Sequence, residues 1–365
     1  MTRYLSTKGA GFAEIEAFGD RLSRMPAVAF WLFFGLVAVL KIGIAGVGPN
    51  FLIPLRSAAA ALPVPDSSFS TSLGAILLMR LAGTPSSAMW WAMGGVGLLL
   101  VVGALLWASR RLGPWAPHAA VILLGSSAFA TLLSMLGHYD LFTVGGSVLV
   151  VLARSRIAGV LGACIACLGN PEQALVAALA MLVVAFVLQS SLRLRGVAFM
   201  TVAFMSVVGT MLWARTGDLE TRGDLLVSDM AFAVRLFLGS WPVYAYSLMG
   251  PLWLVMAALL FWKQGRRMVL AIGLGLGIPL LATVVTLDVT RVFVATSTAA
   301  FLTLLHYVWT TGLQDQEPPR WLLPMMAVLM IIMPSIVILP EPSGFLRLPY
   351  TELLTFLGWP ADWGE

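Results

Sequence analysis

Short polar clusters interrupt the long apolar runs of this 365-residue chain, and their residue types suit acid–base chemistry and phosphate binding. Carboxylates and histidine can take a proton from a hydroxyl or hold a divalent cation. Arginine and lysine bind phosphate. The clusters are Arg56 with Asp66, Gly137-His138-Tyr139-Asp140, Gly169-Asn170-Pro171-Glu172-Gln173, Asp288-Val289-Thr290-Arg291, and Lys41.

The polar residues divide into two chemical groups, which we expect to surround one outward-facing cavity. The candidate proton acceptors or nucleophile-activating residues are Asp66, Asp140, His138 and Glu172. The candidates for binding phosphate, or for supporting a residue that does, are Arg291, Asp288, Lys41 and Arg56. A divalent cation, Mg²⁺ or Mn²⁺, would be held by Asp66 and Asp140.

Each candidate also has a purely structural interpretation. An acid after a proline suits the start of a helix, and residues three apart on a helix can form an ion pair. The structural alternatives are helix capping by His138 and Asp140, a helix-start acid at Glu172, an Asp288–Arg291 ion pair, a turn aspartate at Asp66, and a snorkelling Lys41.

The composition identifies the solvent of most of the chain as lipid. The sequence is 59% hydrophobic, only 11% charged, and has a mean hydropathy of +0.93, whereas soluble domains carry about a quarter charged residues. In hydrocarbon the backbone must satisfy its own hydrogen bonds, so each apolar run of about 20 residues predicts a helix. The net charge of +5 is spread between apolar runs, which argues against a nucleic-acid partner.

We therefore predict an all-α, polytopic transmembrane bundle that crosses the membrane about 10 or 11 times. With a cytoplasmic N-terminus, most Lys and Arg residues fall on the cytoplasmic side and most acids on the other, as the positive-inside rule requires. A glycine pair, Gly273 and Gly277, predicts close helix packing. The predicted spans are 27–47, 88–107, 116–136, 141–153, 157–169, 174–190, 196–213, 242–262, 268–287, 292–310 and 321–339.

The whole chain, 1–365, is predicted to form a single integral membrane domain. Residues 1–26 include an amphipathic helix on the cytoplasmic surface, over about 12–25. Residues 48–87 form the first external loop, with short helices at 55–62 and 70–82. Residues 340–365 form an external tail, and the acidic run from Asp218 to Asp224 reads as a solvated loop.

This arrangement resembles the C-type (GT-C) superfamily of polytopic membrane glycosyltransferases. The loop 48–87 with Asp66 stands where the family's first acidic motif belongs, and the region from Gly137 to Glu172 looks like the second. The resemblance implies a polyprenyl-phosphate sugar donor, a glycan, lipid or protein acceptor, and an active face outside the cytoplasm, in a bacterial inner (plasma) membrane. By resemblance Asp66 is the base. The chain departs from the family pattern in lacking Asp-x-Asp in this loop and a large soluble C-terminal domain.

The expected function is transfer of a hexosyl or pentosyl group to an acceptor hydroxyl, with membrane lipids and the donor as partners. The main alternative is a multi-pass transporter or flippase for a lipid-linked or small polar substrate, in which broken helices bind the substrate near mid-depth. An acyltransferase with His138 as its base and a purely structural subunit are further alternatives.

Overall fold

The structure is a computed structural model, and it describes most of the helical body of the chain. The predicted site residues Arg56, Asp66, His138 and Asp288 lie outside the described part, as does the predicted loop at 48–87 apart from Leu81 and the start of a helix at Ser87. The described residues are 10–42, 81, 87–125, 140–216, 222–250, 253, 265–286, 289–311, 320–333, 335–337, 345–347 and 350–358.

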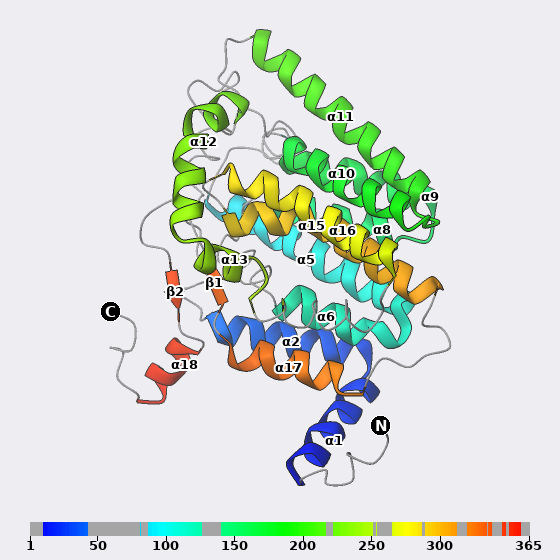
Figure 1. Cartoon of the computed structure of the whole chain (residues 1–365), viewed down its shortest axis with the longest axis vertical. Helices are drawn as coiled ribbons and strands as arrows, with labels where there is room; N and C mark the ends of the chain where they lie inside the picture. Colours follow the sequence, from blue (N-terminus) through cyan, green and yellow to red (C-terminus); the bar gives the residue numbers. More distant parts are fainter. Residues whose placement is uncertain are drawn as a thin grey trace.

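Helices make up nearly all of the described chain, as predicted (Figure 1). Most predicted spans correspond to a helix, although several are shorter than a bilayer requires. The helices are α1 Ala10–Arg24, α2 Ala27–Ile42, α5 Ser87–Leu112, η1 Gly113–Trp115, α6 Ala116–Gly125, α8 Asp140–Leu152, α9 Arg156–Gly169, α10 Pro171–Val187, α11 Arg193–Thr216, α12 Arg222–Gly239, α13 Trp241–Met249, α15 Arg266–Val284, α16 Val289–Thr311, α17 Leu322–Ile332 and α18 Thr351–Phe356.

Prolines and glycines end two predicted spans early. Helix α17 stops at Ile332 because Pro334 holds Met333 in an extended conformation, so the predicted span 321–339 is too long. A short antiparallel pair follows, β1 Ser335–Val337 with β2 Phe345–Arg347. The predicted span 242–262 is interrupted at Gly250, which directly precedes Pro251 in the sequence. Gly250 ends α13 with a φ of 57°, a conformation that glycine adopts readily.

Two further findings concern the segments outside the predicted spans. Helix α12 covers Arg222 and Asp224, which the sequence placed in a solvated loop. The predicted N-terminal amphipathic segment is helical as α1, where Leu22 is buried while Ile15 and Phe18 are exposed, and its place on the cytoplasmic surface stays a prediction. The chain bends by 118° between α1 and α2, at Met25 and Pro26.

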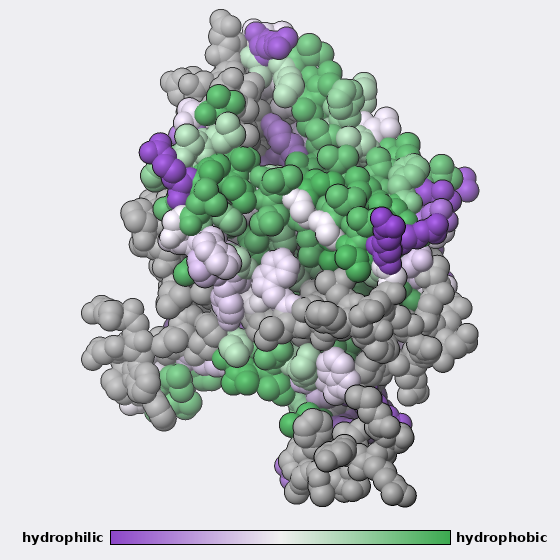
Figure 2. All heavy atoms as spheres, viewed as in Figure 1, coloured by the Kyte–Doolittle hydropathy of each residue, from purple (hydrophilic) through white to green (hydrophobic). Residues whose placement is uncertain are grey.

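Three described helices are long and apolar enough to cross a membrane, and the bent pair α1 and α2 would add a fourth. The three are α11, α15 and the part of α16 up to Val308. Large apolar side chains remain exposed on α11 and α15, and Figure 2 shows a broad apolar surface over this side of the molecule. A surface of this kind is typical of contact with lipid.

Helix α16 forms the centre of the bundle. Every residue from Val289 to His306 is buried, and α16 packs against α8, α10, α13 and α15 (Figure 1). Below it in this view, α2 and α17 both pack on α6. Helices on the opposite side, α9, α10 and α11, complete the cover, so polar side chains on α16 must find partners inside the protein.

Glycines allow the closest helix contacts. Helices α8 and α9 form an antiparallel hairpin in which a Cβ on Gly146 would lie 2.5 Å from the Gly162 carbonyl oxygen. On α15 the close contact falls on Gly275, where a Cβ would lie 2.5 Å from Val184 Cγ2. Gly273 and Gly277, which the sequence favoured for packing, have no other group within 4 Å of an added Cβ. The predicted close packing at Gly273 and Gly277 is therefore wrong, and the close contact on α15 is made at Gly275.

Candidate functional site

A buried ion pair joins the first turns of two helices that are far apart in the sequence. Arg291 Nε lies 3.1 Å from Asp140 Oδ2, and the side chains are 9% and 2% exposed. Asp140 is the first residue of α8, where the positive end of the helix dipole favours a carboxylate. Arg291 is in the first turn of α16. The structure thus brings together one residue from each of the two predicted chemical groups.

Hydroxyl groups extend this polar region toward α13. Thr290 Oγ1 donates a hydrogen bond to Ser247 Oγ at 3.3 Å, and Ser247 donates to the Tyr244 carbonyl at 2.7 Å. Ser247 and Thr290 are fully buried. Sequence reasoning missed Ser247, because a single serine in an apolar run carries no spacing signal that distinguishes it from packing residues.

Glu172 enters the same end of the bundle from α10. Thr143 donates to the Ala166 carbonyl at 3.1 Å, so the last turn of α9 lies beside the first turn of α8. The chain then turns at Asn170, whose Oδ1 caps α10 by accepting from the Gln173 amide at 3.1 Å. Glu172 therefore begins α10 near the level of Asp140.

The start of α10 carries side-chain oxygens that are not fully satisfied. Glu172 is half-buried and its Oε2 has no hydrogen-bond partner among the described residues, and the same holds for Oε1 of the buried Gln173. Buried oxygens without partners are uncommon, since desolvating them costs free energy. In Figure 2 hydrophilic atoms are visible in a recess between α11 and α12, over the region where Figure 1 shows the start of α10.

Lys41 makes a different contact from the one expected of a phosphate ligand. Its Nζ donates to the Met330 carbonyl at 2.6 Å, in the last turn of α17, and the residue is 5% exposed. The Tyr350 amide in turn donates to the Lys41 carbonyl at 3.1 Å. An ammonium at a helix C-terminus is a stabilising arrangement. Lys41 has no hydrogen bond or ion pair with Asp140, Glu172 or Arg291, and we assign it to the packing of α2 on α17.

The described residues do not bring three metal-binding side chains together. No group of three His, Cys, Asp or Glu residues that could hold an ion occurs in this part of the chain. Of the two predicted metal ligands, Asp140 is paired with Arg291, and Asp66 is outside the described residues. The guanidinium already supplies positive charge to Asp140, which disfavours a cation on the same carboxylate.

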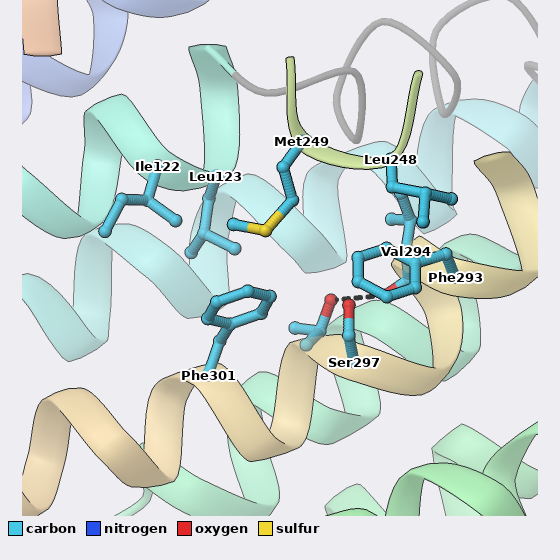
Figure 3. A pocket seen from close by; sticks show the side chains of 9 residues that line it. Ile122, Leu123, Leu248, Met249, Phe293, Val294, Ser297 and Phe301 are labelled. Atoms are coloured by element: carbon cyan, nitrogen blue, oxygen red, sulfur yellow. Dashed lines mark hydrogen bonds between the residues drawn. The ribbon is translucent and has the colours of Figure 1, made fainter. Parts of the chain in front are cut away.

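A small cavity lies deeper along α16, between α6 and α13 (Figure 3). Its volume of about 20 Å³ is enough for one water molecule. Phe293, Phe301 and Met249 line the cavity, and Ser297 points into it. The dashed line in Figure 3 is the hydrogen bond that the Thr298 hydroxyl donates to the Val294 carbonyl at 2.7 Å. The cavity is too small and too apolar to hold a sugar.

No known protein family, curated protein or solved structure matches this chain. Its function must therefore be inferred from its own residues. Among the predicted site residues in the described part, Asp140 and Arg291 meet directly, Glu172 enters the same end of the bundle, and Lys41 is engaged elsewhere.

Proposed function

We propose that the chain is a multispan membrane glycosyltransferase that moves a sugar from a polyprenyl-phosphate donor to an acceptor hydroxyl at the extracytoplasmic face. The observation that carries this proposal is the buried Asp140–Arg291 pair at the start of α8 and α16. The apolar surfaces of α11 and α15 support a lipid environment, and the layout of the sequence resembles the C-type superfamily. We propose a bacterial inner membrane with the N-terminus in the cytoplasm.

Arg291 is the proposed ligand of the donor phosphate. A guanidinium can bind two phosphate oxygens, and Asp140 at 3.1 Å from Nε orients it. In the transition state negative charge develops on the departing phosphate, and a fixed positive group lowers the barrier most when it is already oriented. Asp140 thus acts as a positioning residue, since its carboxylate faces the guanidinium of Arg291.

The proton acceptor is proposed among the remaining acids. Glu172 has a half-buried carboxylate, one oxygen of which bonds to no residue in the described part of the chain, so this oxygen can accept a proton without breaking a described bond. By resemblance Asp66 is the other candidate, with His138 near in sequence to Asp140. Asp288 and Arg56 are proposed to support Arg291 in binding the phosphate.

The proposed reaction is a single displacement. The acceptor oxygen forms a bond to the anomeric carbon while the bond from that carbon to the phosphate oxygen breaks. The electron pair leaves with the polyprenyl phosphate, where Arg291 stabilises it, and the hydroxyl proton passes to the carboxylate base. A metal held by Asp66 is compatible with this scheme, with Mg²⁺ or Mn²⁺ as the ion.

The proposal is tested by assaying sugar transfer in nanodiscs with radiolabelled polyprenyl-phosphate hexose and pentose. Arg291→Gln is expected to lower the rate of transfer per folded protein by about a hundred-fold or more, the usual cost of losing a transition-state contact. Lys41→Met is the matched control, because Lys41 is an equally buried cation that serves packing. Transfer that survives in Arg291→Gln, or that never occurs with any donor, would remove the assignment.

A transporter or flippase is the second candidate, and two observations favour it. Helices α8, α9 and α10 are shorter than a full span, and the buried α16 carries polar side chains along its length, including Thr296, Ser297 and Thr303. Short helices and buried polar groups are typical of transport sites. Translocation of the labelled lipid across proteoliposomes without any change in its sugar would favour this function over transfer.

A further inference from the structure

Two turns at the end of the bundle opposite Asp140 are held together by one arginine. The α8–α9 turn (153–155) and the α10–α11 turn (188–192) lie side by side there. Arg195 Nη1 donates to the carbonyls of Val150 (3.2 Å), Val151 (3.3 Å) and Ala153, and its Nη2 donates to the Arg154 carbonyl (3.2 Å). Because Arg195 belongs to α11, these bonds fix the start of α11 against the end of α8.

The remaining arginines of these turns form an exposed basic surface. Arg154, Arg156 and Arg193 are exposed, and we call them, with the turns that carry them, the arginine surface. Arg193 Nε donates to the Ser190 carbonyl at 3.2 Å. None of the three forms an ion pair with another described residue.

The helices that carry the arginine surface place no acidic residue beside it. The sequence contains no acidic residue between Asp140 and Glu172, and none between Glu172 and Asp218. Both of the nearer acids lie at the opposite end of α8 and α10. Three fixed positive charges therefore face outward without a matching negative charge from the helices that carry them.

Apolar side chains adjoin the arginines. Ile157 and Leu194 follow Arg156 and Arg193 directly and are 75% and 74% exposed. Val160, Leu161 and Val197 continue the exposed apolar surface one turn further along α9 and α11. Figure 2 shows hydrophilic atoms at the right-hand edge bordering this apolar face. The arginine surface next to exposed apolar side chains is complementary to a phospholipid, which has a charged headgroup joined to apolar acyl chains.

We propose that the arginine surface binds the headgroup of an anionic phospholipid, whose acyl chains lie along Ile157, Leu194 and the apolar face of α9 and α11. Juxtamembrane arginines attract anionic lipids, and guanidinium groups bind phosphate oxygens in pairs. A nucleic acid or a soluble acidic protein would bind the arginines but would leave the exposed apolar side chains of α9 and α11 in water. The inference requires membrane insertion but is independent of sugar transfer.

The test is lipid titration of the purified, delipidated protein, followed by native mass spectrometry. Phosphatidylglycerol is the anionic probe and phosphatidylcholine the zwitterionic one. Each arginine is expected to contribute about five-fold in affinity. The triple variant Arg154→Gln/Arg156→Gln/Arg193→Gln should therefore bind phosphatidylglycerol about a hundred-fold more weakly than the wild type. Phosphatidylcholine binding should be unchanged.

A matched triple variant separates this surface from general basicity. Arg266→Gln/Arg267→Gln/Arg320→Gln removes three other exposed arginines and should keep the wild-type affinity for phosphatidylglycerol. Equal binding by both triple variants, or no preference of the wild type for phosphatidylglycerol, would overturn the proposal. So would displacement of the lipid by inorganic phosphate at millimolar concentration, which would assign the site to free phosphate.

Discussion

The chemistry of the described chain centres on the buried charges of Asp140 and Arg291. Removing an ionised group from water costs several kcal/mol, which a partner in contact largely offsets. The pair therefore tolerates burial that neither side chain would tolerate alone. Lys41 meets the same requirement differently, since its ammonium is stabilised by a carbonyl at the C-terminal end of α17 rather than by an acid.

Breaking the pair from one side should destabilise the protein strongly. Asp140→Ala leaves the guanidinium of Arg291 buried without its carboxylate, and we expect a loss of about 3–5 kcal/mol. The double variant Asp140→Ala/Arg291→Met removes both charges and should recover much of that loss. Thermal unfolding in detergent measures both variants, and an unaltered melting temperature for Asp140→Ala would contradict the energetic role of the pair.

Helices in this chain begin and end where local chemistry requires it. Ser155 caps α9 by accepting from the Ala158 amide at 3.0 Å, and Asn170 caps α10. Gly250 ends α13 with a positive φ. The packing between helices depends on small residues, since Gly146 and Gly162 let α8 and α9 approach until backbone touches backbone.

A methyl group at the tightest glycine should be more damaging than one at an open glycine of the same type. Gly146→Ala places a Cβ against the backbone of α9, which cannot move aside, and should cost about 1–3 kcal/mol. Gly273→Ala, in α15, meets no neighbour and should be neutral or slightly stabilising through its helix propensity. Melting temperatures that are equally lowered would argue against backbone contact at Gly146.

Within the whole molecule, the charges that α8 to α11 carry near their turns are unevenly distributed between the two ends of these helices. The acids Asp140 and Glu172 lie at the end where α8 and α10 begin, while Arg154, Arg156, Arg193 and Arg195 gather where α8 and α10 end. If the positive-inside rule holds for this chain, the arginine end faces the cytoplasm, and the proposed transferase and the proposed lipid surface have opposite faces.

The proposed membrane orientation can be tested on a single helix. Helix α11 has 24 residues and is about 36 Å long. Ser191 lies two residues before its first residue, Thr216 is its last residue, and both are exposed. With Cys164 and Cys167 replaced by alanine, Ser191→Cys should react with an impermeant maleimide only in inverted vesicles, and Thr216→Cys only in right-side-out ones. Labelling of both cysteines from one side would show that α11 does not span.

The sequence alone determined the helical class, most helix positions and the separation of charges, because apolar runs, prolines, glycines and basic turns act locally. The contacts of the site were decided by tertiary structure. An ion pair between Arg291 and Asp288 is one interpretation of the sequence, yet the described partner of Arg291 is Asp140, and Lys41 bonds to Met330 rather than to the acids. Which buried charge meets which partner depends on how helices distant in the chain pack together, and hydropathy and spacing along one helix do not encode that choice.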